Sequence, residues 1–167
     1  NPTAAYWYDD ATGNMITSSY YMKSLPTWVE EFNNKKLSDL YLSRLWSPLL
    51  PINEYTESFR DSNKYELGFG KNQIVFPYDL SFISKKDKND KDYGVLKSTP
   101  FGNTLLHDFA IAAIINEQLG KDNITDFLTI SFSATDYIGH RFGPRSVELE
   151  DTYLRLDKEI AHLIDFI

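Results

Sequence analysis

The chain has 167 residues, which suits one domain with a buried core, and its 42% hydrophobic and 25% charged residues exclude a largely disordered polypeptide. No apolar run reaches the roughly 18 residues that a membrane span needs. The net charge of −7 argues against nucleic acid as a partner, and the lack of cysteine excludes disulfides, thiolate metal sites and cysteine nucleophiles.

The N-terminal third carries turn and helix signals. Residues 6–20 predict a β-hairpin, because two short apolar runs flank a turn sequence rich in aspartate, glycine and asparagine. Pro26 suits the first turn of a helix over residues 27–32. A second helix is predicted from residue 38 to about residue 46, with Pro48 marking its end.

The middle of the chain is less regular. Aromatic residues are scattered there without a clear period, and residues 47–98 are interpreted as an insertion on the core. Residues 76–83 are expected to hold a short strand at a sheet edge, because Pro77 cannot donate a backbone hydrogen bond.

The last third predicts a layered arrangement. Residues 103–119 form an almost wholly apolar helix that Gly120 should end, and residues 126–133 are expected to be a buried strand. We expect the helix to pack against this strand through Leu106, Phe109 and Ala113. A final helix begins after Ser146. Helix, strand and helix in succession indicate an α/β fold.

Asp136 and His140 lie directly after the predicted strand, in a segment expected to be a loop. Ligands bind beyond the carboxyl ends of strands in open α/β sheets. A carboxylate oxygen and an imidazole nitrogen suit zinc or manganese, and Gly139 would let the backbone bring them together. The spacing alone is weakly specific, since an exposed loop with a capping aspartate has the same pattern.

Two other groups of side chains are candidates for a functional role. Ser131, Ser133 and Thr135 stand near Asp136 and His140, which raises a Ser-His-Asp hydrolase, but no G-x-S-x-G motif surrounds either serine. The other two histidines are both interpreted as structural. His107 lies near the start of the predicted helix at 103–119, and His162 lies near the end of the last helix, where the helix dipole favours a histidine.

A wider pattern links these motifs. Residues 136–144, followed by the helix at 146–167, together with residues 99–106 and 6–22, resemble the alkaline phosphatase superfamily, most closely its bacterial branch related to the nucleotide pyrophosphatase/phosphodiesterases. The resemblance implies a layered α/β fold, of which residues 1–167 would be one partial domain.

The resemblance also implies a function. Asp136 and His140 would ligate one of two catalytic zinc ions in a phosphomonoesterase, and the Ser or Thr nucleophile would lie upstream of the chain. The remaining ligands would lie before Asn1 and beyond Ile167. We therefore expect an internal fragment with one incomplete zinc site, inactive alone, acting on small phosphate esters and exported, for example to the periplasm.

Several alternative functions fit the same sequence. A phosphodiesterase, a nucleotide pyrophosphatase or a sulfatase relative would carry the same pair, and manganese could replace zinc. A non-catalytic binding module is also possible, because the chain has 11 Tyr, 11 Phe and 3 Trp residues. The predicted strand has no parallel neighbour within the chain, so pairing with a second copy is a further expectation.

Overall fold

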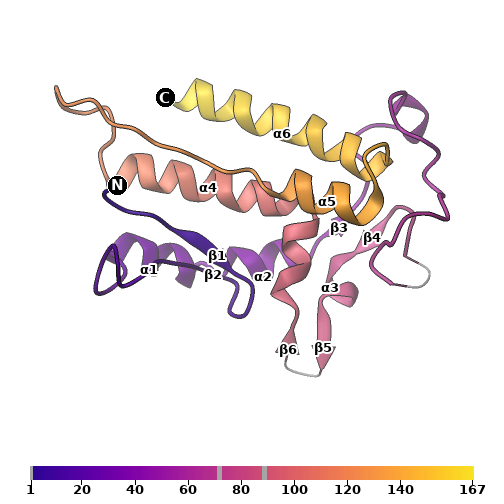
Figure 1. Ribbon diagram of the computed structural model, residues 1–167, viewed down its shortest axis with the longest axis horizontal. Coiled ribbons are helices and arrows are strands. Elements are labelled where there is room, and N and C mark those ends of the chain that lie inside the picture. The colour runs from indigo at the N-terminus through magenta and orange to yellow at the C-terminus, as the bar shows by residue number, and fades with distance from the viewer. Residues whose placement is uncertain (1, 71–72, 88–89) are drawn as a thin grey trace.

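The computed structural model describes residues 2–70, 73–87 and 90–167 (Figure 1). Within these ranges the strands form three antiparallel pairs, β1 with β2, β3 with β4 and β5 with β6. The elements in chain order are β1 (Trp7–Asp9), β2 (Asn14–Ile16), α1 (Thr27–Asn34), α2 (Leu37–Leu42), β3 (Leu45–Trp46), η1 (Ile52–Glu54), β4 (Tyr78–Asp79), α3 (Leu80–Ile83), β5 (Lys85–Asp87), β6 (Asp90–Lys91), η2 (Tyr93–Ser98), α4 (Pro100–Asn116), α5 (Ala134–Phe142) and α6 (Val147–Phe166).

Helix α4 is the centre of the arrangement. It packs against α6 on one side and against α1 and α2 on the other, and α5 and η2 also contact it. Figure 1 shows α6 above α4, with the β1–β2 hairpin, α1 and α2 below. No helix in the described ranges is both long and apolar enough to cross a membrane.

The predicted hairpin near the N-terminus is confirmed. Tyr8 pairs with Met15, and the turn closes with a 2.8 Å hydrogen bond from the Gly13 amide to the Asp9 carbonyl. Gly13 has a φ of +73°, and a side chain there would collide with the ring of Tyr93. Glycine is therefore required at this turn.

The hairpin and α1 cover one face of α4 through aromatic packing. Phe109 of α4 contacts Phe32 edge-on, with ring centroids 5.0 Å apart, and also packs against Trp28 and Tyr6. The expectation that Phe109 would pack against a strand at 126–133 is therefore wrong for this side chain. Its aromatic neighbours come from the N-terminal third, a long-range contact that local patterns do not report.

The predicted helices are present with shifted ends. The helix expected over residues 27–32 is α1. The one expected over residues 38–46 stops at Leu42, because Leu45 and Trp46 instead pair with the strand at Tyr78–Asp79. Helix α4 begins at Pro100, and Gln118, not Gly120, is the first residue after it with a positive φ.

Residues 47–98 contribute directly to a second aromatic cluster. Trp46 and Tyr78 are fully buried and pack with the rings of Phe76, Phe69 and Phe142. The short strand predicted in residues 76–83 is β4, and α3 follows it at once. That this region is an insertion on the core stays a prediction.

The strand predicted at residues 126–133 is not formed. The segment is extended, but it pairs with no strand among the described residues, and its first side chains face solvent, with Phe127 90% exposed. A strand needs a neighbour to satisfy its backbone groups, and none lies beside it here. The sequence predicted the extended conformation correctly and the strand pairing incorrectly.

Helix α6 begins where the sequence places it. The Ser146 hydroxyl accepts a hydrogen bond from the Leu149 amide at 3.2 Å, which confirms the N-cap. Of the apolar side chains spaced along the helix, Leu163 is buried, but Tyr153 and Ile167 are exposed. The buried residues of the first turns include Glu148 and Asp151.

Candidate functional site

Helix α5 carries the two candidate ligands on its outer face. Ala134, Ile138 and Phe142 recur every four residues and are buried against the core, as an amphipathic helix requires. Asp136 and His140 are also four residues apart and lie on the other side, with side chains 75% and 81% exposed. The expectation of a loop at these positions is wrong, since both residues belong to a helix.

The start of α5 is fixed by α4. The amide of Ala134 donates to the side-chain oxygen of the buried Asn103 at 3.1 Å. Gly102 permits the close approach, because a side-chain carbon there would lie 2.9 Å from the Leu96 carbonyl oxygen and 3.3 Å from the Ala134 methyl group. Thr135 donates its hydroxyl to the carbonyl of Phe132, which joins the helix to the extended segment before it.

The helical spacing brings the two ligands together. The Asp136 Oδ1 and His140 Nε2 atoms are 3.5 Å apart, so both can reach one ion. Asp136 also lies in the first turn of α5, where the helix dipole favours a carboxylate. Among the described residues no group of three His, Cys, Asp or Glu side chains could hold a metal ion, so the pair has no third ligand there.

The neighbouring polar residues do not join the pair. Ser131 and Ser133 hydrogen-bond to each other at 2.9 Å, and the only contact of His140 in the described structure is with Asp136. A Ser-His-Asp triad is therefore not formed. Arg141 donates to the carbonyl of Gly68 at 2.8 Å, and partial burial lowers its guanidinium pKa.

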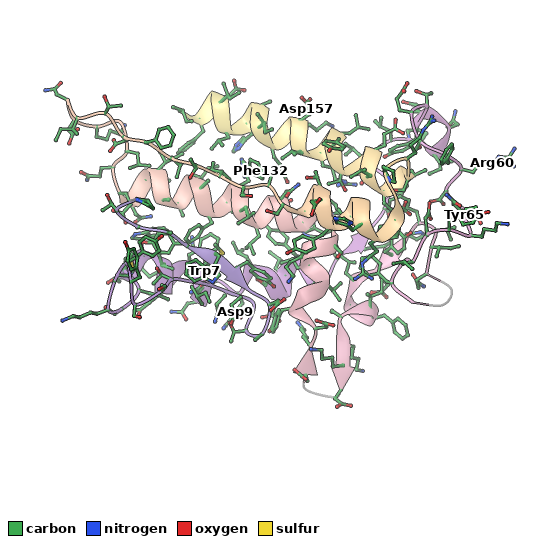
Figure 2. The ribbon with its side chains drawn as sticks, viewed as in Figure 1. Trp7, Asp9, Arg60, Tyr65, Phe132 and Asp157 are labelled. Carbon is green, nitrogen blue, oxygen red and sulfur yellow. The ribbon has the colours of Figure 1, made fainter. Side chains whose placement is uncertain are left out.

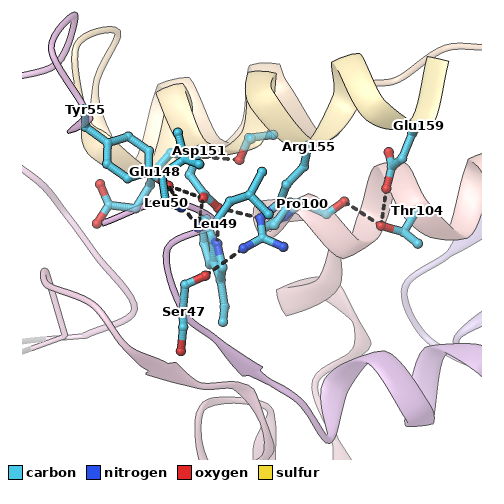
Figure 3. Close-up of polar contacts among 12 residues, drawn as sticks. Ser47, Leu49, Leu50, Tyr55, Pro100, Thr104, Glu148, Asp151, Arg155 and Glu159 are labelled. Carbon is cyan, nitrogen blue, oxygen red and sulfur yellow. Dashed lines mark hydrogen bonds and ion pairs between the residues drawn. The ribbon is translucent and has the colours of Figure 1, made fainter. Parts of the chain in front are cut away.

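A buried carboxylate anchors α6 to the chain that follows β3, as Figure 3 shows. Asp151 is fully buried and accepts from the Trp46 indole at 2.8 Å, the Leu49 amide at 2.7 Å, the Tyr55 hydroxyl at 2.6 Å and the Arg155 guanidinium at 2.7 Å. All four donors converge on one charge, which compensates for its burial. No local pattern predicts this role, because the donors lie up to 105 residues away.

A second buried carboxylate, one turn earlier, is less well satisfied. Glu148 is fully buried and accepts from the hydroxyl of Tyr78, while its other oxygen has no partner among the described residues. Burial raises the pKa of Glu148 to about 8, and burial raises that of Glu66 to about 7. Among the described residues no hydrogen bond or ion pair joins either acid to Asp136 or His140.

A hollow in the surface is separate from the pair. It is shallow, has a volume of about 510 Å³ and lies between Phe69, Phe82 and residues 85–87. Neither Asp136 nor His140 lines it, so this hollow is not part of the candidate metal site. Figure 2 shows the side chains of the described residues, with Phe132 on the extended segment that leads into α5.

Comparison with known proteins defines the class. Residues 3–167 match the family of type I phosphodiesterases and nucleotide pyrophosphatases. The chain is 52% identical over 163 residues to alkaline phosphatase PafA from Elizabethkingia meningoseptica, covering 96% of this chain and 29% of the relative. It is 51% identical over 167 residues to a protein of Myroides odoratus named a calcium-transporting ATPase, covering 98% of this chain and 30% of that protein.

A solved structure gives the same result. The crystal structure of wild-type alkaline phosphatase PafA matches with a TM-score of 0.89 and 49% identity, covering 99% of this chain and 31% of that one. The chain therefore belongs to the type I phosphodiesterase/nucleotide pyrophosphatase family of the alkaline phosphatase superfamily and has part of the alkaline phosphatase fold. It spans about a third of the length of these relatives.

Proposed function

We propose that the protein to which this chain belongs is a zinc-dependent phosphomonoesterase, and that Asp136 and His140 ligate one of its catalytic zinc ions. The separation of 3.5 Å between Asp136 Oδ1 and His140 Nε2 is the observation that supports this most directly. The name of the Elizabethkingia relative, an alkaline phosphatase, supports the choice of reaction.

The pair fits a zinc ion in chemistry and in spacing. Carboxylate oxygen and imidazole nitrogen are both zinc ligands, and two ligands about 2 Å from a tetrahedral ion lie about 3.3 Å apart. Both side chains are exposed and free of competing hydrogen bonds within the described structure. Because catalytic zinc usually takes three protein ligands, further ligands would come from outside the described residues.

The roles of the chain's own residues follow from this placement. Bound zinc would supply Lewis-acid stabilisation of the negative charge on phosphoryl oxygens. Asp136 and His140 would hold it at the outer face of α5, while Ile138 and Phe142 fix that helix to the core. The Ser or Thr nucleophile and a second metal site would be supplied by other parts of the protein.

The substrate class is a small phosphate ester, with a monoester as the first choice. A diester or pyrophosphate is the alternative, which the family description favours. ATP must be tested as well, because the name of the Myroides relative includes ATP hydrolysis. We further propose export, for example to the periplasm, by analogy with bacterial phosphatases of this superfamily.

The test uses the longer protein that contains these 167 residues. Asp136→Asn and His140→Asn should each lower kcat/KM for an aryl phosphate monoester by about 100-fold or more, because each removes a ligand of a catalytic ion. Asp157→Asn is the matched control, an exposed aspartate on α6 that should leave turnover unchanged. An activated diester and ATP are assayed beside the monoester.

The possible outcomes separate the proposals. Wild-type-like turnover in both ligand variants would refute the metal role of the pair. A higher kcat/KM for the diester or for ATP would keep the metal site and replace the substrate. Adding zinc or manganese to metal-free protein decides the metal, since the ion that restores turnover at lower concentration is the native type.

The isolated 167-residue chain should behave differently from the longer protein. It should show no metal-dependent turnover, because the pair lacks a third ligand among the described residues. We also propose that the unpaired segment at 126–133 pairs with a second copy. Turnover near that of the longer protein would contradict the divided site, and a purely monomeric chain in sedimentation would contradict self-association.

A further inference from the structure

Two histidines from distant parts of the sequence meet between α4 and α6. The Nε2 atom of His107 and the Nδ1 atom of His162 are 3.0 Å apart, and the ring centroids are 5.0 Å apart. His107 is 6% exposed, whereas His162 reaches the surface. Two nitrogen ligands of one tetrahedral zinc ion lie about 3.3 Å apart, so a small movement would place both rings on one ion.

The surroundings of His107 prepare it as a ligand. Its Nδ1 atom lies 3.4 Å from Asp108 Oδ1, and the other oxygen of Asp108 accepts from the hydroxyl of Tyr41. A carboxylate that accepts from Nδ1–H leaves the lone pair of Nε2 free, which is the usual arrangement behind a metal-bound histidine. That lone pair points to His162.

The proton between the rings can be replaced by a cation. With the Nδ1 proton of His107 donated to Asp108, the 3.0 Å contact needs a proton on His162 Nδ1. A metal ion bound to both nitrogens would take the place of this proton, which would move to the other nitrogen of His162 or to solvent.

The local charge also favours a cation. Glu159 lies one turn before His162 on α6, and one of its oxygens accepts from the hydroxyl of Thr104. The other oxygen is buried and has no hydrogen-bond partner among the described residues. Asp108 adds a second negative charge near Glu159, and Arg155 is the opposing positive charge.

We propose that His107 and His162 form a second metal site, for a zinc-class divalent ion that prefers imidazole ligands. Coordination would join α4 to α6 through the two rings, with water in the remaining positions, Asp108 compensating the charge and Glu159 adding to this compensation in its ionised form. No three protein ligands converge on one point in the described residues, so the site is a two-histidine site. It goes beyond the proposed function, because neither histidine belongs to the Asp136–His140 pair.

The chain has few histidines, so each imidazole can be followed separately in a test of metal binding. The chain has three, so the imidazole nitrogens of His107, His140 and His162 can each be followed by NMR during a Zn²⁺ titration of the metal-free 167-residue chain. The proposal expects His107 Nε2 and His162 Nδ1 to shift together with one dissociation constant. Their response should persist in His140→Asn, which removes the other candidate ligand.

A second variant makes the result specific. His162→Asn removes one ring at an exposed position and should weaken Zn²⁺ binding at His107 by at least tenfold, with circular dichroism reporting the fold. Asp157→Asn on the same helix is the control and should leave both shifts unchanged. If only His140 responds to Zn²⁺, or if His107 shifts equally in His162→Asn, the two-histidine site does not exist.

Discussion

Asp151 and Glu148 lie one turn apart at the start of α6 and are both fully buried, yet their surroundings differ. Asp151 accepts four hydrogen bonds, two of them from the Tyr55 hydroxyl and the Arg155 guanidinium. Within the described part of the chain, Glu148 accepts one hydrogen bond from a side chain, that of Tyr78, and burial raises its pKa to about 8. A buried carboxylate needs donors in place of the water it has lost, and Asp151 has more of them than Glu148.

The largest expected effect is at Asp151. Asp151→Ala leaves the Trp46 indole and the Tyr55 hydroxyl without their acceptor inside the fold, and it leaves the Arg155 guanidinium with the Ser47 carbonyl alone. Breaking such a network costs about 3–5 kcal/mol of the free energy of unfolding, measured by urea denaturation. Asp157→Ala on the exposed side of α6 is the control. A loss at Asp151 as small as that of the control would show that the network contributes little.

The second effect is a pH dependence at Glu148. Its pKa is raised from 4.5 to about 8, so the folded chain keeps a proton that the unfolded chain releases. Its contribution is complete below pH 4.5 and is lost as the pH rises toward 8. In Glu148→Gln, the fall in the free energy of unfolding between pH 5 and pH 8 should be smaller than in the wild type by on the order of 2 kcal/mol.

Two other acids also make the free energy of unfolding depend on pH in that experiment. Burial raises the pKa of Glu66 and of Glu159 to about 7, so both add loss of stability over the same pH range. A residual slope in Glu148→Gln is therefore expected. An unchanged slope would mean that Glu148 is already charged in the folded chain.

Tyr78→Phe is a smaller change that acts on the same carboxyl group. It removes the one side-chain donor to Glu148 among the described residues, a hydrogen bond that lowers the pKa of this acid. The free energy of unfolding should fall by about 1 kcal/mol, and more above pH 8 than at pH 5, because the charged form loses its donor. Equal losses at both pH values would show that the Tyr78 hydroxyl does not affect the ionisation of Glu148.

The smallest effect on stability is expected at the exposed pair. Asp136→Asn and His140→Asn should each change the free energy of unfolding by less than about 0.5 kcal/mol, since both side chains are largely in solvent. Thermal unfolding in the presence of a chelator checks this. A large loss would show that the pair supports the fold of α5 and is not held free for a ligand.

Local signals in the sequence predicted local structure well. The hairpin follows from its turn residues, the start of α6 from Ser146, and the proximity of Asp136 and His140 from family resemblance. The end of α2 was wrong because Leu45 and Trp46 pair with a strand more than 30 residues away. The strand at 126–133 was wrong because pairing depends on a neighbour, which an apolar run cannot specify.

Long-range polar contacts were the least predictable part of the site region. Glu148 and Asp151 at the start of α6 are buried against residues far away in the chain, which no local pattern reports. His107 and His162 are separated by 55 residues and carry no motif, and only the packing of α4 against α6 brings them together.

The extended segment at 126–133 has a thermodynamic consequence for the ligand pair. It leads directly into α5, and Thr135 binds back to the carbonyl of Phe132, so the position of Asp136 depends on how this segment is held. If a polypeptide pairs with the segment and thereby raises the metal affinity of the pair, bound metal must raise the affinity of that polypeptide for the segment by the same factor. Metal loading and assembly of the sheet would then be two measurements of one coupling free energy.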